Sequence, residues 1–320
     1  MPEQILDAYG RWWQVETWLR TVMYINLKSE FGTSWHGHLA PQAARYARND
    51  SAHEYMSTPD RSDLMSYLDT GKLFELIEGK FEKYRLDEIL ISRASWSGRV
   101  PELQKIRRSI AHCRRPHRDD VNRLEQLLRD LEPGFWHFFD AQSAEASKIL
   151  MGDPVIEQWR GSKISHLREH VERKYTLDIT LGFASQVWAD RESVSDRISG
   201  KPGFLWALDL GGPDYFVDLE RFWSGMDSVV REAVVNVFSP SPFGLCVTLS
   251  AVDRPELVGR AIENVISCYG RASRAIQSVS RSWVDAWPGD RDLVDPRVMV
   301  DQALALLSHD DRGTTIFCAG

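Results

Sequence analysis

The chain has 320 residues, which exceeds the usual span of one hydrophobic core and predicts two domains. Hydrophobic residues make up 43% of the sequence and charged residues 27%, a balance that excludes a disordered chain. The formal net charge of −7 argues against a surface that is basic throughout. Because no apolar run approaches the ~18–20 residues that cross a bilayer, and the N-terminus lacks a signal-peptide pattern, we expect a cytoplasmic protein with no membrane partner.

The first half of the chain has the apolar spacing of helices. Between residues 2 and 27 the apolar and aromatic residues recur at helical intervals, which predicts one long buried helix. The stretch FGTSWHGH ends it, and a second helix is expected around residues 39–56. Two shorter helices are expected after Gly71, separated at Gly79.

A helical hairpin closes this half of the chain. The stretch SRASWSGRVP reads as a break, after which a helix runs from about Pro101 toward His112. The last helix carries leucines at 3- and 4-residue spacing and should end before Pro133 and Gly134. We therefore predict an all-α helical bundle over residues 1–148.

Past residue 150 the period of the pattern changes. Residues 175–183 and 243–249 alternate apolar and polar side chains, which predicts half-buried strands, and GFLWALDL and the terminal TTIFC read as further strands. Asp253 with Glu256 resembles a capping box that starts a helix, and Asp295-Pro296 starts another. Residues 149–320 should therefore form an α+β domain of unidentified fold.

Motifs for metals and cofactors are weak. The four cysteines (Cys113, Cys246, Cys268, Cys318) have no zinc-site spacing and are expected to be free thiols. His166-Leu-Arg-Glu169-His170 matches the order of an inverted zinc-protease motif, but no third ligand is identified, and the charged solvent face of a helix is the preferred interpretation. No phosphate-binding loop or dinucleotide motif occurs, so no metal and no cofactor is indicated.

The charge is unevenly distributed. Between Arg99 and Arg123 there are eight Lys or Arg residues and three acids, within a chain that is acidic as a whole. Such a segment would attract a phosphate-bearing partner, although a solvated basic helix face gives the same pattern. Within it lies LQKIRRSIAHCRRPHRDDVNRL, where Arg107 and His112 form an Arg-x4-His arrangement.

This segment resembles the HEPN superfamily of RNA-binding and RNA-cleaving domains. It looks most like the branch named after a eukaryotic transcript-surveillance RNA endonuclease, whose pattern is an Arg-Asn pair, a small residue, Ala-His and an acidic helix start. YLDTGKLFELI, the Arg-His segment and DDVNRL match in order, as does the first helix with its WLR, so the resemblance covers most of residues 1–145. Its specificity comes from this placement, because Arg-x4-His alone is common by chance.

The resemblance implies metal-independent RNA cleavage by a homodimer that pairs through the HEPN-like domain. His112 would be the general acid or base, since an imidazole exchanges protons near neutral pH, and Arg107 would hold the phosphate. Arg108, Arg114, Arg115, His117 and Arg118 would bind the RNA backbone.

One residue departs from the family pattern. Arg108 stands where active relatives often carry Asn, and it lies four residues before His112, so either Arg107 or Arg108 could bind the phosphate. A purely structural role, in which Arg107 and His112 bridge two helices or pair with Asp119 or Asp120, is the alternative for this site.

Two functions follow from these residues. The first is an endoribonuclease that acts as a regulated toxin or phage-defence effector, with the C-terminal domain sensing a trigger or contacting a regulatory protein partner. The second is a non-catalytic HEPN-like module that binds RNA or protein through the basic hairpin. The Arg at position 108 slightly favours the second.

Overall fold

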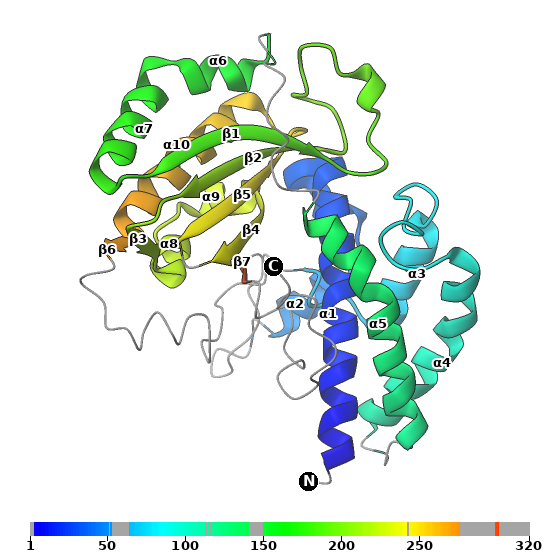
Figure 1. Cartoon of the computed structure of the whole chain (residues 1–320). Helices are drawn as coiled ribbons and strands as arrows, with labels where there is room; N and C mark the ends of the chain where they lie inside the picture. The colour runs from blue at the N-terminus through cyan, green and yellow to red at the C-terminus, as the bar shows by residue number, and fades with distance from the viewer. Residues whose placement is uncertain are drawn as a thin grey trace. The chain divides into compact units, whose positions relative to one another are not determined.

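The computed structural model describes residues 3–50, 52, 64–112, 114, 117–140, 150, 152–241, 243–275 and 298–300. Their contacts divide the chain into two compact units (Figure 1). Among the described residues, the first unit comprises residues 3–24 and 39–140 and is helical, whereas the second comprises 25–38 and residues from 150 onward and contains a β-sheet. A helical N-terminal region followed by a region with a sheet is thus confirmed.

The structure places residues 25–38 in the second unit, whereas the sequence predicted a single domain boundary near residue 148. They are the last turns of the first helix and a 3-10 helix, η1 (Gly32–His38). The backbone N–H of Gly203 donates to the carbonyl oxygen of Ser29 at 2.9 Å, and the indole N–H of Trp188 donates to Asn26 at 2.6 Å. These long-range bonds explain the grouping, which no periodicity in the sequence reveals.

The described helices of the first unit form one apolar core. They are α1 (Glu3–Phe31, of which residues 3–24 lie here), α2 (Pro41–Asp50), α3 (Thr70–Lys80), α4 (Arg93–Ala111) and α5 (Arg118–Asp140). Trp18 of α1 stacks on Phe135 of α5 with ring centroids 4.4 Å apart, and Phe74 of α3 meets Trp96 of α4 edge-on at 5.6 Å. Aromatic contacts therefore join α1 to α5 and α3 to α4.

The hairpin helices are longer than predicted. The helix expected from Pro101 begins at Arg93, because Ser92 caps its N-terminus and Trp96 is fully buried on its core face. The last helix continues through Pro133 and Gly134 to Asp140. A Cβ on Gly134 would lie 2.4 Å from the carbonyl oxygen of Ile89, so this glycine permits close packing where the sequence suggested a stop.

Two other predicted helices are shorter or absent. The helix expected over 39–56 is described from Pro41 to Asp50, and much of the remainder lies outside the described residues. After Gly71, one helix runs through Gly79 to Lys80, and residues 81–89 form successive turns in which Arg85 has a positive φ of 49°. The left-handed backbone at Arg85 prevents a second helix there.

The second unit has a five-stranded sheet in the order β1-β2-β5-β4-β7. Its pairs are antiparallel except for β4 with β7. The strands of this sheet are β1 (Asp178–Ser185), β2 (Phe204–Gly211), β4 (Val234–Ser241), β5 (Gly244–Ser250) and β7 (Val298–Val300), and β3 (Tyr215–Val217) pairs separately with β6 (Ser273–Ala275). The helices are α6 (Pro154–Arg160), α7 (Ser162–Tyr175), η2 (Arg191–Ser193), α8 (Leu219–Ser224), α9 (Ser228–Ala233) and α10 (Pro255–Ala272).

One face of this sheet carries the apolar core. Alternate residues of β2, from Phe204 to Leu210, pack in one cluster with residues of α6, α7 and α10. Figure 1 shows α6, α7 and α10 close to the strands β1 and β2. The other face of the sheet is buried too, at Leu205, Ala207 and Thr248, so β5 is not the half-buried strand that the alternation predicted.

Several details of this unit differ from the sequence predictions. β1 begins at Asp178 rather than residue 175, because Thr176 has a left-handed backbone that ends α7. Asp253 does not cap α10; its carboxylate accepts the backbone N–H of Thr33 at 2.8 Å. Residues 298–300 form a strand where a helix was expected after Asp295-Pro296, while that dipeptide and TTIFC lie outside the described residues.

Within the part of the chain that the structure describes, no helix has the length and apolarity required to cross a membrane. Cys246 and Cys268, the two cysteines in that part, are buried free thiols.

Candidate functional site

The end of α4 carries the Arg-x4-His residues. The buried residues of this helix are Trp96, Leu103 and Ile106, which fix the face that α4 turns to the core. Arg107 follows Ile106 and is half-buried, and Arg108 is exposed. Because consecutive helical residues are rotated by about 100°, the two arginines leave the helix in different directions.

His112 is the C-cap residue of α4. Its backbone N–H donates to the carbonyl oxygen of Arg108 at 3.1 Å, and its side chain is exposed. Arg108 and His112 are therefore one turn apart, whereas Arg107 lies about 140° away around the helix. No hydrogen bond joins the side chains of these three residues in the described part of the chain.

The acids that could neutralise this site are engaged elsewhere. The carboxylate of Asp119 lies 3.2 Å from Nδ1 of His117, and the carboxylate of Asp120 accepts the backbone N–H of His117 at 2.9 Å. Among the described residues, neither Arg107 nor His112 forms an ion pair or a side-chain hydrogen bond. The expected alternative, in which these two pair with Asp119 or Asp120, is not what the described contacts show.

The chain then turns into α5. The backbone N–H of Arg114 donates to the carbonyl oxygen of Ser109 at 2.9 Å, and the side chains of Arg114, His117 and Arg118 are exposed. Arg115, the remaining residue predicted to bind the RNA backbone, lies outside the described residues.

The cations of this hairpin fall into two groups. Arg99 is bonded to Asp130, and Arg123 lies 3.2 Å from Glu102, so these two are neutralised and join α4 to α5. The others have no acidic partner in the described part of the chain, and they are Lys105, Arg107, Arg108, Arg114 and Arg118. A hairpin end with unpaired cations attracts anions, and guanidinium groups bind phosphate as well as carboxylate in bidentate fashion.

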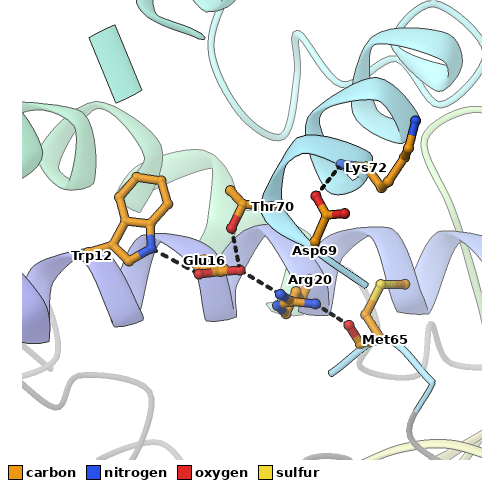
Figure 2. A network of polar contacts seen from close by, with 7 residues as sticks. All are labelled: Trp12, Glu16, Arg20, Met65, Asp69, Thr70 and Lys72. Atoms are coloured by element: carbon orange, nitrogen blue, oxygen red, sulfur yellow. Dashed lines mark hydrogen bonds and ion pairs between the residues drawn. The ribbon is translucent and has the colours of Figure 1, made fainter. Parts of the chain in front are cut away.

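A polar network that the sequence did not indicate joins the middle of α1 to the start of α3. Figure 2 shows the carboxylate of Glu16 accepting the indole N–H of Trp12 and the hydroxyl of Thr70, each at 2.9 Å, and also bonded to Arg20. The guanidinium of Arg20 also donates to the backbone oxygen of Met65. This network fastens the start of α3 to α1. The i, i+4 spacing of Trp12, Glu16 and Arg20 is the signal that could have indicated it.

The other candidate motifs do not form sites. His166, Glu169 and His170 are exposed on α7, in agreement with the preferred interpretation of a solvated helix face. Within the described residues, no three His, Cys, Asp or Glu side chains are grouped so as to hold a metal ion.

Comparisons of this chain with protein-family models, with curated proteins and with solved structures find no match.

Proposed function

We propose that this chain is a metal-independent endoribonuclease of the HEPN type, acting in the cytoplasm as a homodimer. The observation that supports it is the end of α4, where Arg107, Arg108 and His112 have no acidic partner in the described part of the chain. Cations grouped at one end of a hairpin without acids to neutralise them attract a phosphate-bearing partner such as RNA.

The reaction needs an imidazole, an imidazolium and a guanidinium, which two copies of this site would supply. The ribose 2′-oxygen attacks the adjacent phosphorus, the bond from phosphorus to the 5′-oxygen breaks, and the products are a 2′,3′-cyclic phosphate and a 5′-hydroxyl. An imidazole such as that of His112 removes the 2′-hydroxyl proton, and an imidazolium returns a proton to the leaving 5′-oxygen. Arg107 stabilises the added charge on phosphorus.

Arg108 is the second candidate for the phosphate ligand. It is exposed and one turn from His112, while Arg107 is half-buried. The exposed cations Arg114 and Arg118, together with Arg115 and His117, extend the surface that would follow the RNA backbone.

A homodimer supplies two imidazoles to one cleft, one for each proton transfer. The first unit also has an exposed apolar stripe on α1, formed by Leu6, Tyr9 and Trp13, whose exposed fractions are 57%, 59% and 45%. These residues recur at i, i+3 and i+7 and so share one helix face. Exposed apolar patches of this kind mark association surfaces, and we assign this one to a second copy of the chain.

The second unit would regulate the nuclease, either by sensing a trigger or by contacting a regulatory protein partner. Regulation is expected for a toxin or phage-defence effector, because unrestrained RNA cleavage harms the host cell.

The experiment is incubation of the purified full chain with total RNA in EDTA, with analysis of the fragment ends. We expect cyclic-phosphate ends and a loss of about 10²–10⁴-fold in rate for His112→Ala, the usual contribution of a general acid or base. The matched control is His166→Ala, which removes an exposed histidine from α7 and should leave cleavage unchanged. Arg107→Ala and Arg108→Ala decide the phosphate ligand, since the true ligand should cost about 10²–10³-fold in kcat.

The alternative is a non-catalytic HEPN-like module that binds RNA or protein through this hairpin. Arg108 in place of Asn favours it, because a second guanidinium adds to docking without supplying proton transfer. RNA binding without cleavage, unchanged in His112→Ala and weakened in Arg108→Ala, would establish this alternative.

A further inference from the structure

The second unit contains a cavity of about 340 Å³. Its walls come from α6, α7, β1 and β2, with Leu150 completing them. The volume is at the lower end of the ~300–1,000 Å³ typical of ligand pockets, so it suits a single small molecule.

Three aromatic residues are among those that line the cavity. Phe183 of β1 and Trp206 of β2 are direct partners across the antiparallel pair, so their side chains lie on the same face of the sheet. Trp159 of α6 adds a third ring to the wall, and Leu181 and Ile156 complete the apolar part. Such a surface favours a planar ring that stacks on these aromatics.

A buried donor in the wall lacks a partner. Trp206 is only 1% exposed, and its indole N–H makes no hydrogen bond among the described residues. The hydroxyl of Ser165 also lines the cavity.

The charged groups of the wall have one sign. Arg160 and Arg168 line the cavity, and its lining, all of it described, includes no acidic residue. The guanidinium of Arg168 lies 4.5 Å from the ring centre of Trp159, and its Nε is 3.7 Å from a carboxylate oxygen of Glu172, which is outside the lining. Two guanidinium groups beside stacking surfaces favour a planar ligand with an anionic group.

We propose that this cavity binds a phosphate monoester joined to a planar ring, a molecule of the mononucleotide class. A monoester carries about −1.5 to −2 charges at neutral pH, which matches two arginines better than a single carboxylate does. The ring would lie against Phe183 and Trp159. This proposal does not depend on the nuclease proposal, because its residues all belong to the second unit.

The test is isothermal titration of the full chain with AMP, GMP, CMP and UMP, and with adenosine and inorganic phosphate as half-ligands. We expect at least one mononucleotide to bind more tightly than either half-ligand. Arg168→Ala should weaken that binding about tenfold or more, since it removes a charge-assisted hydrogen bond. Arg173→Ala, which removes an exposed arginine of the same helix outside the cavity lining, is the matched control and should leave binding unchanged.

A second variant tests the cavity without removing charge. Ser165→Phe places a ring into the space and should abolish binding while the thermal unfolding midpoint stays near that of the wild type. The proposal is overturned if no mononucleotide binds, if inorganic phosphate binds as tightly as the nucleotides, or if both variants bind like the wild type. Binding of an aromatic carboxylate such as indole-3-acetate in preference to every mononucleotide would also overturn it.

Discussion

Asp153→Ala should be among the most destabilising single substitutions in the second unit. The side chain is fully buried, and its Oδ1 accepts the backbone N–H of Val155 at 2.9 Å and the hydroxyl of Ser199 at 2.6 Å. Its Oδ2 accepts the backbone N–H groups of Ile198 and Ser199 at 2.9 and 2.8 Å. One carboxylate therefore caps α6 and holds the loop between β1 and β2.

The size of the expected loss in the free energy of unfolding follows from the hydrogen-bond donors that alanine leaves without a partner. Three are backbone N–H groups, and each buried, unpaired N–H costs about 1–3 kcal/mol. Water entering the space of the lost carboxylate recovers part of this cost, so we expect a loss of about 3–5 kcal/mol in the free energy of unfolding. Asp153→Asn keeps one acceptor oxygen and should lose less.

Asp227→Ala is the matched control. Asp227 caps α9 by accepting the backbone N–H of Val229 at 3.1 Å, but it is exposed, so its loss should cost only about 1 kcal/mol. Urea unfolding gives both values, and hydrogen exchange of peptides from α7 and α4 assigns the change to one unit. If Asp153→Ala cost no more than Asp227→Ala, the reasoning from buried donors would be refuted.

Three further predictions concern charge, pH and association. Arg118→Ala should reduce, by about 0.7, the steepness with which the logarithm of the binding constant for single-stranded RNA falls with the logarithm of salt concentration. Fluorescence anisotropy at several salt concentrations measures this slope. An unchanged slope would show that Arg118 does not contact the RNA backbone. Burial raises the pKa of the Asp253 carboxyl from 3.8, and bonds from Thr33 and the charge of Lys28 lower it only in part. The stability that the protonated carboxyl contributes is therefore present below pH 3.8 and is lost as pH rises through the pKa of the folded state. Over that pH range Asp253→Asn should become progressively more stable relative to the wild type. Urea titrations would contradict this if the difference in free energy of unfolding did not change with pH. Trp13→Ser should shift sedimentation toward the monomer and lower cleavage with His112 intact, whereas an unchanged oligomeric state would show that the α1 stripe is not the dimer surface.

The sequence predicted those elements whose periodicity agrees with their burial. β1 alternates apolar with polar residues and is buried at alternate positions in its first half, a pattern that a short window of sequence carries, whereas β2 and β5 are buried at nearly every position. The first half of α4 was missed because Gly98 and Pro101 look like helix breakers, while the burial of Trp96 depends on α3 and cannot be seen in a window of sequence. Tertiary packing there overrides local propensity.

The two candidate sites also differ in how far the local sequence predicts them. Arg107, Arg108 and His112 lie within six consecutive residues, so their spacing on a helix could be worked out before the helix was seen. The cavity instead joins residues between Leu150 and Trp206 through the pairing of β1 with β2 and the packing of α6 and α7. No local pattern predicts that pairing, which is why Arg168 looked like one more charge on a solvated helix.

Because the two sites belong to different units, their coupling can be measured directly. If the nucleotide-class ligand controls RNA binding, it changes RNA affinity by some factor, and RNA must change the ligand's affinity by the same factor. Binding of a non-cleavable RNA to His112→Ala, with and without the ligand, gives that factor without interference from the reaction. Arg168→Ala should then abolish the effect of the ligand on RNA binding and leave RNA binding in its absence unchanged. If the ligand binds but leaves RNA affinity unchanged, the cavity does not control RNA binding. The reason is that a ligand with equal affinity for two states of the protein does not shift the equilibrium between them.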